Sequence, residues 1–213
     1  MNDVYFGFYA RFETVSKKEA SLLLGSDNLV GDVYEIEFRT ENRQRIAWLK
    51  NRFDAYVGFF GEETSRQLSL FEARGWKVSA LLSFIAYSES PAPGIYWGEC
   101  ALVCFDPKEQ VAFTLFMEGL SRRMAEGLRP DVALGTQGVA QVLANQGNWV
   151  PKKTVPLPSL EKGVALLKTR RGLTEGLVEL ARQRNKGCYV ASWLLLLLAA
   201  AGIIFALKSC GVF

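Results

Sequence analysis

The chain has no histidine among its 213 residues. This absence excludes His-based acid–base catalysis and catalytic triads, and it removes most zinc sites. The four cysteines, Cys100, Cys104, Cys188 and Cys210, do not follow a metal-binding spacing. Cys100 and Cys104 share a face of an expected strand about 13 Å apart, too far for a disulfide, so we expect both to be buried apolar side chains. We expect no metal site, no cofactor and no enzymatic activity. No spacing of Ser, Lys or carboxylates supports a catalytic site.

The amino terminus lacks the basic start and long apolar run of a secretory signal. The long apolar run is carboxy-terminal: residues 188–207 contain no charged residue and no Pro. A helix of this length is about 30 Å long, which matches the hydrocarbon core of a bilayer. We therefore predict a single tail-anchoring transmembrane helix. The residues expected to mark this span are Cys188, Tyr189, Trp193, Leu194, Leu198, Gly202 and Leu207.

Charge is distributed unevenly along the chain. Residues 1–106 hold 11 basic and 15 acidic side chains, whereas residues 152–186 hold nine basic and three acidic ones. Basic flanks stay on the cytoplasmic side of a membrane, so we predict a cytoplasmic amino-terminal domain and a carboxyl terminus on the opposite side. Segment 152–186 also suits anionic lipid headgroups. Its expected membrane-surface residues are Lys168, Arg170, Arg171, Arg182, Arg184 and Lys186.

Alternation, caps and turn residues predict the elements of the remaining chain. Strands are expected at 4–12, 30–39, 45–50, 53–60, 76–88 and 95–105, and helices at 17–24, 62–74, 106–126 and 136–145. Residues 163–169 are either a last strand or an interfacial stretch. The fold class we predict is α+β, with a mostly antiparallel, small barrel-like sheet and packed helices, followed by the transmembrane helix.

We divide the chain accordingly. Residues 1–127 are expected to form the cytosolic α+β domain, 128–172 a connector with a small helical or extended appendage, 173–186 a basic juxtamembrane helix, 188–207 the span and 208–213 a short tail. The stretch 76–88 shows the longest alternation. It places Trp76, Val78, Ala80, Leu82, Phe84 and Ala86 on one face. At this length we expect the strand to bend or to cross a sheet corner.

Residues 30–105 carry a family resemblance. The segment Tyr56-Val57-Gly58-Phe59-Phe60 precedes a helix with Ser65, Gln67 and Leu68, and Ala73-Arg74-Gly75-Trp76-Lys77-Val78 then opens a long strand. This order resembles a HIRAN domain. The resemblance implies a small OB-like barrel with helices, in a family that binds DNA ends when attached to helicases. The acidic-Pro and Asn-Pro-x-Asp signatures of that family are missing, so we carry over the fold and not the DNA binding.

Four aromatic residues are candidates for a ligand platform: Trp76, Tyr87, Tyr96 and Trp97. They could stack on bases or on a peptide, and the alternative is packing in the core. Arg122, Arg123 and Arg129 form a small basic cluster, which either complements the helix dipole or faces the lipid surface.

The function expected from these features is a tail-anchored, single-pass membrane protein whose cytosolic domain is a non-enzymatic binding or adaptor module. Its expected partners are the lipid bilayer and a protein. The alternative is a HIRAN-like nucleic-acid-binding module tethered to the membrane, which the acidic amino-terminal half disfavours. Gly202 and Ala206 have a spacing that allows close helix approach, so homodimerisation through the span is compatible with the sequence.

Overall fold

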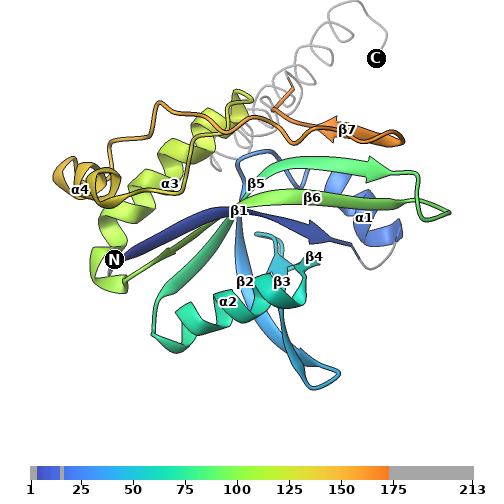
Figure 1. Ribbon diagram of the computed structural model, residues 1–213, viewed down its shortest axis with the longest axis horizontal. Helices are drawn as coiled ribbons and strands as arrows, with labels where there is room; N and C mark the ends of the chain where they lie inside the picture. Colours follow the sequence, from blue (N-terminus) through green and yellow to red (C-terminus); the bar gives the residue numbers. More distant parts are fainter. Residues whose placement is uncertain (1–3, 15–16, 173–213) are drawn as a thin grey trace, which may run out of the picture. The chain divides into compact units, whose positions relative to one another are not determined.

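The computed structural model describes residues 4–14 and 17–172 (Figure 1). The expected juxtamembrane helix, the span and the tail, with Arg182, Arg184 and Lys186, lie outside these residues. Among the helices that are described, none is both long and apolar enough to cross a bilayer. The first of the two compact units of the chain ends at Arg171.

Six antiparallel strands close into a barrel (Figure 1). They are β1 (Tyr5–Glu13), β2 (Val33–Glu41), β3 (Gln44–Lys50), β4 (Tyr56–Phe60), β5 (Lys77–Ser88) and β6 (Ile95–Phe105). Their order is β2-β3-β4-β1-β6-β5, and pairing of Val33–Glu35 with Ser79–Leu81 joins β2 to β5. The structure thus confirms an α+β fold with a closed antiparallel barrel.

Four helices and a seventh strand complete the described chain. They are α1 (Lys17–Leu24), α2 (Glu62–Ala73), α3 (Gln110–Ala125), α4 (Thr136–Ala144) and β7 (Val164–Lys168). A 3₁₀ turn, η1 (Pro107–Glu109), precedes α3. Asp106 caps this turn, because its carboxylate accepts a hydrogen bond of 3.0 Å from the Lys108 amide. Residues 164–168 pair with the end of β5, which selects the strand among the two alternatives for this segment.

Two apolar cores lie on opposite faces of the sheet. The barrel interior contains Phe12, Tyr34, Phe60 and Leu68, all at most 1% exposed. A second core lies outside the barrel, where α3 and α4 cover β1, β5 and β6. It contains Tyr5, Leu81, Phe105, Phe113 and Phe116. Strands β1, β5 and β6 therefore pack apolar side chains on both faces, whereas β2 and β3 have one solvent-exposed face.

The predicted alternation along β5 is wrong after Leu82. The register against β6 shifts between Leu82 and Phe84, so Ser83 is an extra residue in a β-bulge. Because one inserted residue reverses every following side chain, Ile85 enters the barrel interior. Phe84 and Ala86 face outward and pack against Trp97.

The bulge also lets one strand serve two neighbours. Before it, Ser79–Leu81 close the barrel against β2. After it, Ile85–Ser88 pair with β7. The expected bend of β5 is therefore present, and it brings the segment after α4 into the same sheet as β1–β6.

Candidate functional site: an aromatic recess beside β1

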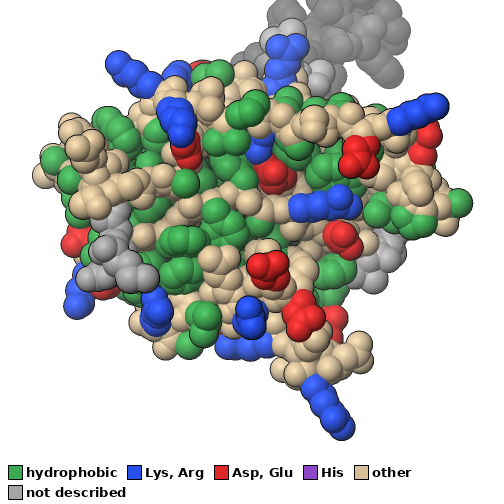
Figure 2. All heavy atoms as spheres, viewed as in Figure 1, with side chains coloured by type: hydrophobic (Ala, Val, Ile, Leu, Met, Phe, Trp, Pro, Cys, Tyr) green, Lys and Arg blue, Asp and Glu red, His purple; other side chains and the backbone are tan. Residues whose placement is uncertain are grey.

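A recess of about 620 Å³ opens between the start of β1, the second half of α2 and the start of α4. Its lining residues are Tyr5, Phe6, Gln67, Leu70, Phe71, Arg74, Trp76, Leu134, Gly135 and Thr136. We call it the aromatic recess. Its volume lies within the range of roughly 300–1,000 Å³ that is typical of ligand pockets. Figure 2 shows hydrophobic side chains gathered along β1 on the face viewed.

Three rings form a continuous stack in this recess. The ring centroids of Phe6 and Phe71 are 5.0 Å apart, and those of Phe71 and Trp76 are 5.2 Å apart. Phe6 is 37% exposed and Leu70 is 58% exposed. Large apolar side chains with this exposure, grouped around one hollow, are typical of an interaction site.

The end of α2 places Trp76 in the stack. Gly75 has a φ of +76°, the left-handed conformation that glycine adopts without strain. The chain reverses there, and the Trp76 amide donates a 3.0 Å hydrogen bond to the Phe71 carbonyl. This reversal folds the indole back onto the Phe71 ring, so the local sequence at the helix terminus builds one wall of the recess.

One cation lies at the rim of the aromatic recess. The Arg74 guanidinium is 5.9 Å from the centre of the Phe71 ring. Among residues 4–14 and 17–172 no carboxylate forms an ion pair with it, although Arg45, on the neighbouring strand β3, pairs with Glu72 at 2.6 Å. Gln67 adds an amide to the same lining. The recess therefore combines apolar surface with a positive charge that a ligand can neutralise.

The structure does not bring the four predicted platform residues together. Trp76 lies before the start of β5, whereas Tyr87 lies near its end and pairs with Tyr96, with ring centroids 4.9 Å apart. Trp97 packs edge-on against Phe84 at 5.6 Å. The aromatic recess keeps only Trp76 of the four.

Two of the other platform residues, Trp97 and Tyr87, already have hydrogen-bond partners for their side chains. The Trp97 Nε1 donates to Ser88 Oγ at 2.9 Å, and the Tyr87 hydroxyl donates to the Pro93 carbonyl at 3.1 Å. These contacts hold the β5–β6 hairpin, which favours a structural role. Sequence reasoning missed Phe6 and Phe71, because neither ring is distinguished from core residues by its position in a strand or a helix.

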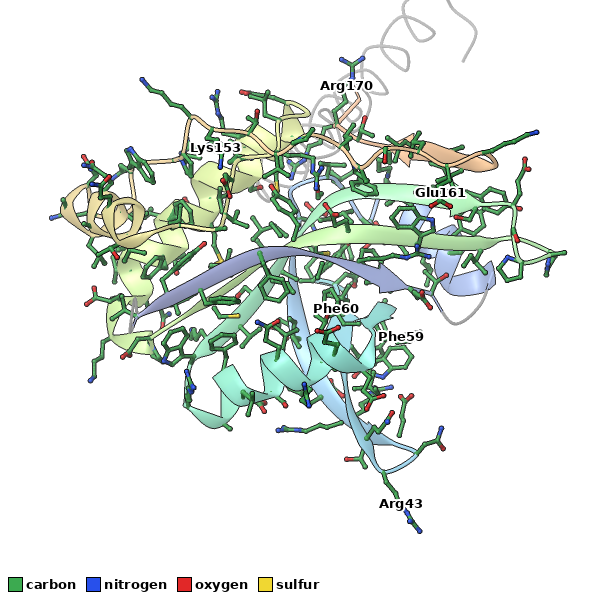
Figure 3. The ribbon with its side chains drawn as sticks, in the orientation of Figure 1. Arg43, Phe59, Phe60, Lys153, Glu161 and Arg170 are labelled. Atoms are coloured by element: carbon green, nitrogen blue, oxygen red, sulfur yellow. The ribbon has the colours of Figure 1, made fainter. Side chains whose placement is uncertain are left out.

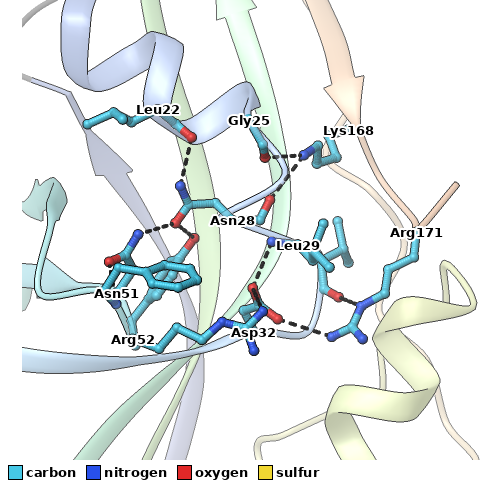
Figure 4. A network of polar contacts seen from close by, with 12 residues as sticks. Leu22, Gly25, Asn28, Leu29, Asp32, Asn51, Arg52, Lys168 and Arg171 are labelled. Carbon is cyan, nitrogen blue, oxygen red and sulfur yellow. Dashed lines mark hydrogen bonds and ion pairs between the residues drawn. The ribbon is translucent and has the colours of Figure 1, made fainter. Parts of the chain in front are cut away.

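Two of the predicted membrane-surface residues turn toward the protein (Figure 4). Lys168 Nζ donates to the carbonyls of Leu24, Gly25 and Asn28 at 3.3, 3.1 and 3.0 Å. It thus provides a hydrogen-bond donor to carbonyl groups at and after the carboxyl end of α1, where a positive charge is favourable. Arg170, by contrast, is exposed and projects away from the barrel (Figure 3).

Arg171 joins the end of the described chain to the loop before β2. Its Nε donates to the Val30 carbonyl at 2.7 Å, and its guanidinium pairs with Asp32 at 3.2 Å. The side chains of Arg171 and Asp32 are only 16% and 10% exposed. Asp32 also accepts from the Leu29 amide at 2.9 Å, so this carboxylate organises the loop.

The same loop is anchored by a buried amide network (Figure 4). Asn28 donates to the Leu22 carbonyl at 2.7 Å. Its Oδ1 accepts from the Tyr34 hydroxyl at 3.1 Å and from Asn51 at 3.2 Å. Burial raises the pKa of Tyr34, so its hydroxyl stays a donor at neutral pH. The network is internally satisfied and therefore stabilises the fold.

Arg129 is buried, which corrects its grouping with Arg122 and Arg123 in a basic cluster that complements the helix dipole or faces the lipid surface. It is 6% exposed and pairs with Glu99 of β6. Its Nε donates to the bulge residue Ser83 at 3.0 Å, and its guanidinium also donates to the Pro156 carbonyl. Burial raises the pKa of Glu99, and the charge of Arg129 opposes that shift. This buried pair joins β5, β6 and the segment after α4.

Cys100 and Cys104 are buried and unpaired inside the barrel, as predicted. Burial raises the pKa of Cys104 to about 12 and also raises that of Cys100. Neither thiol is a thiolate at neutral pH, so neither is activated as a nucleophile. In the part of the chain that the structure describes, no three His, Cys, Asp or Glu side chains are grouped to hold a metal ion.

Comparisons with known proteins give no relative of this chain. No protein family, no curated protein and no solved structure matches it. The resemblance to HIRAN domains is therefore not confirmed. The barrel itself, with six antiparallel strands and closure of β2 on β5, is compatible with an OB-like fold.

Proposed function

We propose that this chain is a membrane-tethered, non-enzymatic binding module whose barrel holds a partner in the aromatic recess. The observation that carries the proposal is the stack of Phe6, Phe71 and Trp76, in which Phe6 is exposed, around a 620 Å³ hollow. Apolar surface with a few polar groups is the usual composition of a site that binds by burial.

The lining of the recess suits retention of a partner more than turnover. Its ionisable groups are the cation Arg74 and the hydroxyl of Tyr5. That hydroxyl donates to the Val132 carbonyl at 2.8 Å, and burial raises its pKa. A general base at neutral pH would need a pKa near the working pH, and burial moves the pKa of Tyr5 away from that range.

The tether in this proposal is the apolar stretch 188–207. Lys168 and Arg171 fasten the chain to the barrel domain up to Arg171. Only residues 172–187 then separate this fixed point from the apolar stretch, so the domain would work close to the membrane surface. Arg170 is exposed and would suit anionic headgroups on the cytoplasmic side, whereas Lys153 Nζ pairs with Asp131 at 2.7 Å (Figure 3).

The recess can be tested by photo-crosslinking in cells that express the full chain. A photoreactive amino acid replaces Leu70, which lies in the recess, and in a control chain it replaces Val111, which is 77% exposed on α3. We expect a discrete adduct from position 70 that is absent from position 111. Equal labelling from both positions, or none from position 70, would count against the recess as the binding site.

The tether is tested separately by deleting 187–213. We expect the full chain to stay with membranes after carbonate extraction and the shortened chain to become soluble. A shortened chain that still pellets under these conditions would show that the apolar stretch is not the anchor.

Nucleic-acid binding is the alternative function, and the OB-like barrel is the feature that favours it. On the outer face of the barrel, the Arg39 guanidinium lies 3.6 Å from the centre of the Tyr56 ring. Glu37, however, accepts from both Arg39 and the Tyr56 hydroxyl, at 3.2 and 2.5 Å. Salt-dependent binding of single-stranded DNA at about 50 mM salt would support this alternative, and its absence would reject it.

A further inference from the structure

We propose that the partner is an extended peptide that adds as a strand to the open edge of β1 and places one large apolar side chain in the aromatic recess. This inference rests on the proposed function, because it names the chemistry of the partner that the recess would hold.

The two edges of β1 differ. Along one edge, β6 pairs with every residue from Tyr5 to Glu13. Along the other, the described pairing with β4 is confined to Phe12 and Glu13. Strand β4 ends at Phe60, and the chain turns at Gly61 into α2.

The open edge carries main-chain hydrogen-bonding groups. Among the described residues, no strand pairs with Tyr5–Arg11 on the side away from β6. In an antiparallel strand, alternate residues direct their N–H and C=O groups to opposite edges. Every second residue from Tyr5 to Arg11 therefore directs these groups toward the open side, which is the template for strand addition.

Helix α2 follows strand β4 in the chain and packs mainly on strands other than β1. The helix packs mainly on β3 and β5. Ser65 of α2 accepts a 3.0 Å hydrogen bond from the Ala47 amide of β3, and Leu68 fills the barrel end. The helix also contacts β1 through the stacking of Phe71 on Phe6. A strand edge and a helix thus border the aromatic recess from two sides.

The recess supplies side-chain specificity to such a strand. In an extended peptide, every second side chain points to the same face. A peptide residue paired near the Tyr5 end of β1 would reach the Phe6–Phe71–Trp76 stack. The volume of the aromatic recess accommodates an aromatic or a large aliphatic side chain. A flat ring of the peptide would stack on the exposed Phe6 ring.

Charge selects the residues next to that anchor. Arg74 lies at the rim, and within the described residues it forms no ion pair. A carboxylate on the peptide, from a side chain or from its terminus, would complement this guanidinium. The partner is therefore an extended peptide with an aromatic or large aliphatic anchor beside an acidic group.

The test uses the full chain in detergent micelles with 5-fluorotryptophan incorporated. The probe is a synthetic heptapeptide selected from a random heptapeptide library displayed on phage. We expect the peptide to shift the fluorine resonance of Trp76, which is assigned through its loss in Trp76→Phe, and to leave that of Trp97 unchanged. Leu70→Ser should weaken binding at least fivefold, and Val111→Ser, the matched exposed control, should not.

Main-chain pairing is tested by methylating each peptide nitrogen of the selected heptapeptide in turn. Strand addition predicts at least tenfold weaker binding at alternate positions and little change at the positions between them, because only every second N–H would face β1. A peptide that binds the recess with no such period of two would overturn strand addition, while the proposed binding function would stand.

A second probe separates failure of this inference from failure of the proposed function. If no peptide is selected but 3-phenylpropanoate shifts the Trp76 resonance, the recess binds small aromatic acids and the peptide inference is wrong. If neither probe shifts this resonance while the Trp48 and Trp97 resonances show a folded chain, the proposed function fails as well. A shift by oligothymidylate alone would favour the nucleic-acid alternative and overturn the peptide.

Discussion

Three arginines distinguish two regions of this molecule. In the region where the segment after α4 returns to the barrel, Arg129 pairs with Glu99 and Arg171 pairs with Asp32. In the aromatic recess, Arg74 pairs with no carboxylate among the described residues and lies near the partly buried Phe71 ring. The cations of the first region have partners within the protein, whereas the second region offers a cation and apolar surface to a binding partner.

The difference shows how structural and functional cations can be told apart. Arg129 and Arg171 each contact residues at least 27 positions away in the sequence, including main-chain carbonyls. Such contacts fix the tertiary fold, and their geometry is satisfied without a ligand. We therefore expect substitutions at these three arginines to separate stability from binding.

The largest effect is expected at Arg129. Arg129→Met keeps the aliphatic bulk but leaves the buried Glu99 carboxylate without its partner. Removing one partner of a buried pair costs about 3–5 kcal/mol. Urea unfolding followed by near-UV circular dichroism measures this loss. The double variant Glu99→Gln/Arg129→Met should recover part of it, and a loss below about 1 kcal/mol would show that the pair is not effectively buried.

A smaller effect is expected at Arg171. Arg171→Met removes hydrogen bonds to the Val30 carbonyl and to Asp32, which at this partial burial should cost about 2 kcal/mol. Faster amide exchange in β7 and in the loop before β2 would locate the change. Arg170→Met is the matched control, because Arg170 is exposed, and we expect it to change stability by no more than about 0.5 kcal/mol.

The pH dependence of stability gives a third test. Because burial raises the pKa of Glu99, the folded state binds this proton more tightly than the unfolded state. The contribution of Glu99 to the free energy of unfolding therefore falls as pH rises from its ordinary pKa to its raised pKa.

Arg129 lowers the pKa of Glu99, so Arg129→Met should raise it further and extend this window to higher pH. The slope for one proton cannot exceed about 1.4 kcal/mol per pH unit. Unfolding measured between about pH 4 and pH 8 should show a steeper decline for Arg129→Met than for the unchanged chain. The double variant with Glu99→Gln should lose this added slope, and parallel curves for all three proteins would contradict the assignment.

The smallest effect on stability is expected at Arg74. Its exposed side chain has no ion pair among the described residues, so Arg74→Met should change the free energy of unfolding by at most about 0.5 kcal/mol. It should nevertheless weaken the selected heptapeptide about three- to tenfold, mainly through a slower association rate. Titrations at low and high salt measure this, and unchanged affinity would exclude Arg74 from recognition.

Much of the fold could be predicted because local signals mark its boundaries. Ile95–Phe105 is the strand expected from the sequence, and Glu62–Ala73 ends beside Gly75 as its cap predicts. The Asp106-Pro107 start of the helical segment after β6 is also as expected. These features depend on caps, turns and alternation within a few residues, so the sequence alone suffices to read them.

The sites were less predictable, because they depend on contacts between distant elements. Trp76 and Tyr87 belong to one alternating stretch of sequence, but Trp76 lies just before β5 and Tyr87 lies near the end of this strand. Lys168 and Arg171 belong to a basic run, yet both bind the segment 24–32. Composition near an apolar stretch indicates a membrane surface, and it does not reveal which cations the fold itself uses.

The sequence by itself determined the elements of this protein, the burial of Cys100 and Cys104 and the mostly antiparallel character of the sheet. Only the tertiary structure decided the closure of β2 on β5, the bulge at Ser83, the burial of Arg129 and the stack of Phe6 on Phe71. The physical reason is that hydrophobic periodicity and capping act over a few residues, whereas closure, buried ion pairs and recesses require partners that the chain brings together only on folding.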